Sequence, residues 1–278
     1  MNIVHLSDTH VGVRDNLSRL NKIVTTVISN YHPKDTVVLH TGDLIDSYSD
    51  ANCALAKIEL NRLHDAGYRV LMCPGNHDYG NSAYIDNAFA RAYRALFLKE
   101  ILGDRNSTFP VVNFIGDCAF IGLDTMQDEM GFFARLFADG NVGAHQRSKL
   151  TERIKIARST HKKIIVYMHH HPFINGYSVR PDIGDPNMAF RLLQWFTRPF
   201  RRLKDAYSLM QILRDKVDIL LFGHQHTGLN HAFEAERYGI KLALDGSSST
   251  CMDMPMDDMH IRVIDTDTMT FTTLLIPI

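Results

Sequence analysis

Several common features are scarce in this sequence, and each scarcity argues against a class of protein. The 278 residues include only four cysteines and no C-x-x-C pair, so neither a disulfide framework nor a thiolate metal site is indicated. No uninterrupted apolar stretch approaches the ~20 residues that a membrane-spanning helix needs. The first residues, MNIVHLSDTH, lack the charged and then apolar pattern of a secretory signal. We therefore expect a cytoplasmic protein with reduced cysteines and no integral membrane association.

A basic excess is absent as well. Lysine and arginine number 30 against 31 acidic residues, a formal net charge of -1, so nucleic acid is not an expected partner. One local exception is the aromatic segment from Asn187 to Lys204, which has five basic and no acidic residues. Its spacing predicts an amphipathic helix, interrupted at Pro199. Packing against the body, a cap over a site and attachment to an anionic membrane all stay open for it.

The apolar pattern predicts an α/β fold. Five buried-strand patterns alternate with helical patterns, which favours a mainly parallel arrangement. Two further strand pairs with short turns look antiparallel, and a last strand closes the chain. We expect a two-sheet mixed sandwich flanked by helices, as a single domain over residues 1–278 with a candidate cap or insert at 175–207. The five strands are Asn2 to Leu6, Thr36 to His40, Tyr68 to Cys73, Lys163 to Met168 and Asp218 to Phe222; the pairs are Val111 to Ile115 with Ala119 to Asp124, and Ile240 to Leu244 with His260 to Asp265; the last strand is Phe271 to Ile276.

A polar motif follows each of the five predicted strands. Because ligands collect at the carboxyl ends of strands in α/β sheets, these motifs are expected to meet. Carboxylate, amide and imidazole groups are mixed oxygen and nitrogen donors that suit Mn, Fe, Co or Zn. The motifs are Asp8-Thr9-His10, Gly42-Asp43, Gly75-Asn76-His77-Asp78, His169-His170-His171-Pro172 and Gly223-His224-Gln225-His226.

With these motifs the sequence resembles the calcineurin-like metallophosphoesterase superfamily, whose pattern D-x-H, G-D, G-N-H-[DE], H-x-P and G-H-x-H is complete and in order. The resemblance spans Asp8 to His226. Within the superfamily the chain is most similar to class III cyclic nucleotide phosphodiesterases and glycerophosphodiesterases. The resemblance implies two transition metal ions, divalent or of mixed valence, and metal-dependent hydrolysis of a phosphoester.

The resemblance also implies a ligand set. One metal would be held by Asp8, His10, Asp43 and His226, and the other by Asp43, Asn76, His170 and His224, so that Asp43 bridges. The family's ligand lies two residues before a proline, which selects His170 over His169 and His171. The run of three histidines leaves this register open by one residue.

The implied reaction is hydrolysis of a small-molecule phosphodiester by a hydroxide that bridges the metals, with a 3',5'-cyclic nucleotide as a candidate substrate. His77 would donate a proton to the leaving oxygen or stabilise charge, and Asp78 would orient its imidazole. Two divalent ions, two carboxylates and a hydroxide leave a site charge of about +1, which suits a singly charged diester. A homodimer stays an open alternative.

Three other functions, and structural roles for several single residues, are alternatives to this interpretation. A DNA nuclease shares D-x-H and G-N-H-D, but the balanced charge argues against it. A lipid-directed pyrophosphatase is suggested by the basic aromatic segment, and a scaffold without catalysis is disfavoured because every motif is complete. Single residues also have structural interpretations: His5 and His40 as packed core groups, Asp46 as the cap of the following helix, and His145 and His231 as members of solvated loops.

Overall fold

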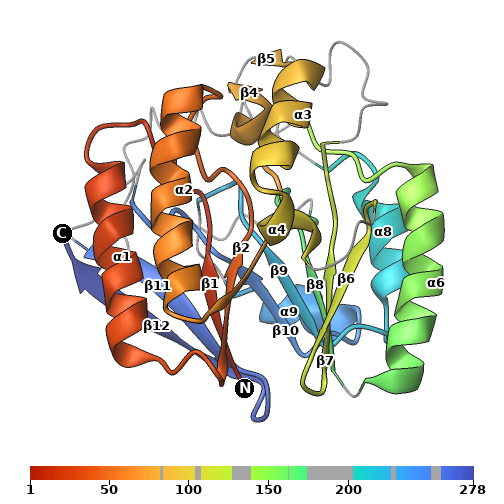
Figure 1. The fold of residues 1–278 in the computed structure, drawn as a ribbon. Coiled ribbons are helices and arrows are strands. Elements are labelled where there is room, and N and C mark those ends of the chain that lie inside the picture. Colours follow the sequence, from red (N-terminus) through yellow and green to blue (C-terminus); the bar gives the residue numbers. More distant parts are fainter. Residues whose placement is uncertain are drawn as a thin grey trace, which may run out of the picture.

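The computed structural model describes residues 1–81, 84–103, 108–126, 139–161, 163–173, 203–226, 230–251 and 258–278. Two five-stranded sheets stand face to face between two groups of helices, as Figure 1 shows. Helices α1 (Asn16–Asn30) and α2 (Asp50–Asp65) cover the outer side of one sheet. Helices α6 (Ala144–Thr160), α8 (Ala206–Leu213) and α9 (Ala232–Arg237) cover the outer side of the other. The architecture is the predicted two-sheet sandwich.

The first sheet has the strand order β12-β11-β1-β2-β3. Its parallel part is formed by β1 (Asn2–Leu6), β2 (Thr36–His40) and β3 (Arg69–Met72). The strand β11 (Asp258–Asp265) is antiparallel to β1 and to β12 (Thr270–Pro277). The end of the chain therefore completes the sheet that its beginning starts.

The second sheet has the order β10-β9-β8-β7-β6. The strands β7 (Cys118–Gly122), β8 (Lys163–Tyr167), β9 (Ile219–Phe222) and β10 (Leu242–Asp245) are parallel, and β6 (Val111–Ile115) pairs antiparallel with β7. The prediction that Ile240 to Leu244 pairs with His260 to Asp265 is wrong. These two segments belong to different sheets: β10 pairs with β9, whereas β11 pairs with β1 and β12, and the two strands meet only across the apolar layer between the sheets.

Side chains that alternate along each strand fill three apolar layers. Ile3 of β1 and Ile165 of β8 belong to the layer between the sheets, whereas Val4 packs with α1 and α2, and Ile164 packs with α6 and α8. Strands with both faces buried explain the continuous apolar runs in the sequence. The sheets are thus fixed from both sides, which makes their ends rigid supports for the loops that follow.

Smaller elements lie above the carboxyl end of the first sheet. They are the 3₁₀ turn η1 (His77–Tyr79), the short strands β4 (Gly80–Asn81) and β5 (Tyr84–Ile85), and the helix α3 (Asn87–Leu96). The helix α4 (Leu98–Leu102) follows α3 and lies beside the sheet, against β3 and α2. Of the candidate cap at 175–207, residues 175–202 lie outside the described residues, as does most of the basic segment.

Candidate metal centre

A first ligand group forms where β1 and β9 end. The Nε2 atom of His226 lies 3.1 Å from Oδ1 of Asp8 and 3.3 Å from Nε2 of His10. Asp8 also accepts the backbone N–H of His224. Ligand atoms around a transition metal with bonds of about 2.0–2.1 Å are spaced roughly 3 Å apart, so these three side chains have the spacing of a coordination shell.

A second ligand group joins β2, β8 and the loop after β9. The Nε2 atom of His169 lies 3.3 Å from Oδ2 of Asp43, 3.0 Å from Oδ1 of Asn76 and 3.2 Å from Nδ1 of His224. The other ring nitrogen, Nδ1, donates to the carbonyl oxygen of Thr41 at 2.8 Å. A neutral His169 therefore points the lone pair of Nε2 at oxygen atoms that also carry lone pairs. A cation in their midst would satisfy all of them, and the Thr41 contact is the outer bond that metal-bound histidines usually make.

The structure does not bring His170, the residue selected by its distance from proline, into this group. The Nδ1 atom of His170 hydrogen-bonds with the Thr125 hydroxyl at 2.7 Å, and its ring lies beside Gly140. His169 occupies the predicted place because it follows β8 by only two residues and its side chain points at the loop after β2.

The backbone at the ligands is unusual. Asp8, His10, Asp43, His224 and His226 all have φ between 45° and 77°, where residues other than glycine are uncommon. Such conformations persist only where the surroundings impose them, and they are frequent at functional sites. Glycines make the close approach possible: a Cβ at position 75 would lie 2.2 Å from Oδ1 of Asp43.

Electrostatics also favour a cation here. Burial alone would raise the pKa of Asp43, but the imidazoles of His169 and His77 hold it well below its usual range. Burial would likewise lower the pKa of His169, but the Asp43 carboxylate raises it to about 9. A position that keeps a fully buried imidazole protonated is one that stabilises positive charge, and a metal ion can replace that proton.

His77 stands beside the ligand groups and is held by Asp46. Its Nδ1 donates to the backbone carbonyl of Asp46, whose carboxylate oxygen lies 3.5 Å from the same atom and 3.4 Å from Nδ1 of His10. Asp46 does not cap α2, because Ser49 takes that position and accepts the N–H of Asn52. Asp46 thus supports the site instead of a helix, and its only signal in the sequence is its position three residues after Asp43.

Asp78 does not orient His77 as expected. Its buried carboxylate accepts three backbone N–H groups, those of Asp43, Ile45 and Gly75, and so joins the loops after β2 and β3. Burial, reinforced by the Asp43 carboxylate, raises the pKa of Asp78 to about 7. Its role is to hold the Asp43 loop.

His5 and His40 lie in the core, as predicted from the sequence. His5 and His40 are buried and hydrogen-bond the hydroxyls of Thr41 and Thr9, at 2.9 and 3.1 Å. Neither belongs to a ligand group among the described residues.

His231 lies in the interior, contrary to the expected solvated loop, and forms a cluster with His171 and Asp245. The Nδ1 atom of His171 accepts the backbone N–H of Phe173, so its Nε2 carries the proton. That proton can bridge the 3.1 Å to Nε2 of His231, and the pair therefore has the donor and acceptor it needs without an ion. The ring of His171 packs against Phe222 and Phe173.

A family model described as calcineurin-like phosphoesterase matches residues 1–228. The chain belongs to this family. It is accordingly a phosphoesterase that depends on a dinuclear metal centre. No curated protein matches the chain.

Solved structures share the fold of this calcineurin-like phosphoesterase. A dimetal phosphatase from Danio rerio superimposes with a TM-score of 0.67 at 11% identity, over 95% of this chain and 91% of that chain. The sulfate thiohydrolase SoxB of Thermus thermophilus has a TM-score of 0.52 at 11% identity, over 99% of this chain but only 56% of that chain. Within the described residues, no helix has the length and apolar character to cross a membrane.

Proposed function

We propose that this calcineurin-like phosphoesterase hydrolyses a small-molecule phosphodiester. One ion is held by Asp8, His10, Asp43 and His226, and a second by Asp43, Asn76, His169 and His224. These assignments keep the ligands predicted from the sequence except that His169 replaces His170. The observation that carries them is the convergence of Oδ2 of Asp43 and Oδ1 of Asn76 on Nε2 of His169, since these atoms are compatible only with a cation among them, either a proton or a metal ion that replaces it.

Ions bound by these residues activate a water molecule and offset charge on the phosphoryl oxygens. The mixed nitrogen and oxygen donors suit Mn, Fe, Zn or Co. Asp8 and Asp43 are the carboxylates of the proposed set, and Asn76 supplies a neutral oxygen where a third carboxylate would weaken the attraction for an anion. The remaining positive charge suits a diester with a single negative charge.

The proposed proton donor is His77. Because its Nδ1 donates to the Asp46 carbonyl, its Nε2 faces outward and, when the ring is in the imidazolium form, can release a proton to a leaving oxygen. The ring is 15% exposed, in contrast to the buried ligands His10 and His169, so a substrate can reach it. Asp46 fixes the direction of the ring.

An activity panel with manganese tests this proposal. It compares cyclic AMP, bis(p-nitrophenyl) phosphate, p-nitrophenyl phosphate, single-stranded DNA and a lipid pyrophosphate. We expect kcat/KM for the aryl diester to exceed that for its monoester at least about tenfold. A preference for the monoester would contradict the proposal, while hydrolysis of DNA or of the pyrophosphate alone would establish one of the alternative functions.

A further inference from the structure

Four successive hydroxyl side chains, Ser247 to Thr250, follow β10 outside the segment matched by the family model. Each one bonds the backbone of a loop that carries proposed ligands, and we call them the hydroxyl clasp. Ser247 donates to the carbonyl of His226 at 2.9 Å, Ser248 to that of Asp8 at 2.8 Å and Thr250 to that of Thr9 at 2.9 Å, while Ser249 accepts the N–H of Ser7 at 3.1 Å.

The loop that the clasp holds has a backbone of high energy. Asp8 and His10 both have positive φ, at 49° and 45°. The carbonyls of Asp8 and Thr9 are buried with their residues, and a buried carbonyl without a donor is costly. The hydroxyls of Ser248 and Thr250 supply those donors, so they favour the one conformation in which Asp8 and His10 face His226.

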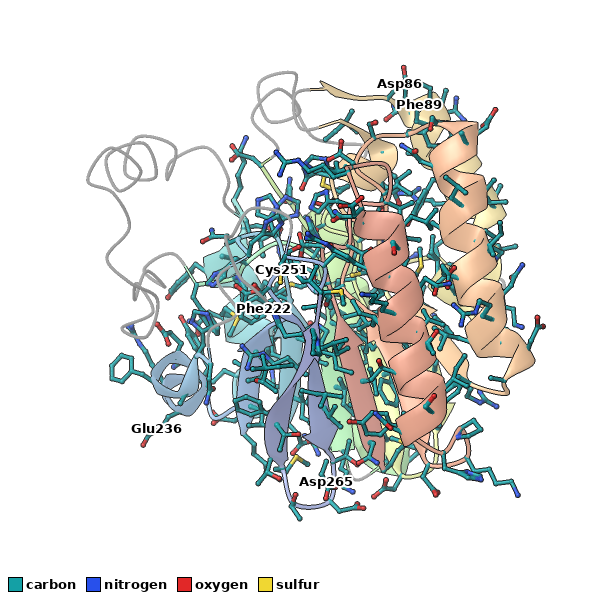
Figure 2. All side chains as sticks on the ribbon, turned by 90° about the vertical axis from the view of Figure 1, so that its left-hand side faces the viewer. Asp86, Phe89, Phe222, Glu236, Cys251 and Asp265 are labelled. Atoms are coloured by element: carbon teal, nitrogen blue, oxygen red, sulfur yellow. The ribbon has the colours of Figure 1, made fainter. Side chains whose placement is uncertain are left out.

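The clasp is itself fixed from outside the site. The carboxylate of Asp245 accepts the N–H of Ser247 at 2.8 Å, and Arg19 of α1 donates to the carbonyl of Thr250 at 2.7 Å. In Figure 2, Cys251, which follows the clasp, lies near Phe222 at the end of β9, whereas Asp265 lies at the opposite end of the sheets. The clasp thus connects the D-x-H loop of the first sheet to the G-H-x-H loop of the second at the ligand end.

We propose that the hydroxyl clasp is a positioning element that sets the metal affinity of the first ligand group, Asp8, His10 and His226. This inference rests on the proposed function, because it takes these residues as ligands. The hydrogen bonds of the clasp hydroxyls run to Ser7, Asp8, Thr9 and His226, all in loops that carry the first group. Loss of a clasp hydroxyl should therefore weaken one metal site and spare the other.

The test is a cobalt(II) titration without substrate, followed by the visible absorption of the bound ion and by calorimetry. Thr250→Val should weaken binding at one site roughly tenfold or more, the lower end of what outer-shell substitutions cost, with less than about twofold change at the other. Ser248→Ala should do the same. Thr250→Ser, which keeps the hydroxyl, should restore the affinity.

Thr266→Val is the matched control. Thr266 is as buried as Thr250, and its hydroxyl also donates to a carbonyl at 2.9 Å, that of Met1 at the far end of β1. It should lose thermal stability comparably but keep both metal affinities. Equal weakening in Thr266→Val, or unchanged affinity in both Thr250→Val and Ser248→Ala, would overturn the clasp. Should Thr250→Val not fold, Ser248→Ala and Thr250→Ser carry the same comparison.

The titration also separates this inference from the proposed function. A wild-type protein that binds two ions but hydrolyses no diester in the panel would refute the function and leave the affinity comparison valid. If the wild-type protein binds two ions and hydrolyses a diester, but the loss of clasp hydroxyls leaves both metal affinities unchanged, only the clasp is refuted.

Discussion

Two buried groups of charged side chains in this protein look alike by composition but differ in how their donors are arranged. In one, the carboxylate of Glu100 in α4 accepts hydrogen bonds from Lys57 at 2.7 Å and His64 at 2.8 Å. In the other, His169 directs an acceptor nitrogen at the acceptor oxygens of Asp43 and Asn76. The first group supplies its own cation and is structural, whereas in the second the place between the acceptors is filled by a proton on His169 or by a metal ion that replaces it.

The comparison teaches that buried charge alone does not identify a site. The histidine tautomer must be known as well, because the hydrogen-bond partner of one ring nitrogen determines whether the other nitrogen is a donor or an acceptor. The carbonyl of Thr41 leaves His169 with an acceptor, and the N–H of Phe173 leaves His171 with a donor. Two histidines two residues apart thus have opposite capacities for a metal ion.

The substitution with the largest expected effect is Asp43→Ala. It removes the carboxylate shared by the two proposed metal positions, so we expect turnover to fall by at least about 10³-fold and metal content to drop. Elemental analysis and the diester assay measure both quantities. Glu100→Gln, in the self-sufficient group, is the control and should keep full metal content. Two bound metals with normal activity in Asp43→Ala would contradict the contrast between the groups.

The next effect distinguishes adjacent histidines. His169→Ala should empty the second metal position and lose activity, because it removes the nitrogen facing Asp43 and Asn76. His170→Ala removes the hydrogen bond with Thr125 and the ring contact with His224, but no atom of the second ligand group, and should keep both metals. If elemental analysis finds metal loss in His170→Ala alone, the ligand is His170, as its distance from Pro172 predicts, and not His169.

A smaller loss of rate is expected from His77→Ala. The variant should bind both metals, because His77 lies outside the proposed ligand set, yet lose roughly 10² to 10⁴ in kcat, the range for general acid-base groups. Single-turnover kinetics with bis(p-nitrophenyl) phosphate, paired with metal analysis, measure this. Loss of metal in this variant would reassign His77 as a ligand.

The smallest effect concerns stability in the Glu100 group. Burial alone would raise the pKa of Glu100, but the bonds from His64 and Lys57 lower it to about 2, against an ordinary value of 4.5. Its contribution is present above about pH 4.5 and is lost as the pH falls toward 2. Glu100→Gln should therefore lower the free energy of unfolding by about 3 kcal/mol at pH 7, and the deficit should shrink in acid. Denaturant titrations at pH 7 and pH 3 measure it; a deficit that is constant with pH would refute the charge-based account.

Much of the fold could be predicted from the sequence because its strands are apolar on both faces. The bounds of β1, β2 and β6 match the predicted segments, and β8 and β9 each differ by one residue at one end. Sheet membership was harder. The segments Leu242 to Asp245 and Asp258 to Asp265 are close in sequence, and both contain apolar residues. Only their pairing with β9 and with β1 shows that they join different sheets.

The candidate site was predictable as a set of motifs but not in its register or its supports. Successive histidines after a strand have equivalent chemistry, so the distinction between His169 and His170 depends on the orientation that the loop at Thr41 imposes. Asp46 and the hydroxyl clasp act through contacts with segments distant in the chain, up to 242 residues for Ser249 and Ser7. Contacts of this kind have no signature in the local sequence pattern.

The central claim, that the inward-pointing acceptors form a two-metal centre, is tested most directly by anomalous diffraction from crystals of the manganese-loaded protein. The account predicts two peaks about 3.5–4 Å apart, with Asp43 between them and His169 bound to one. A single peak, peaks at His171 and His231, or two peaks with His170 in place of His169 would contradict it.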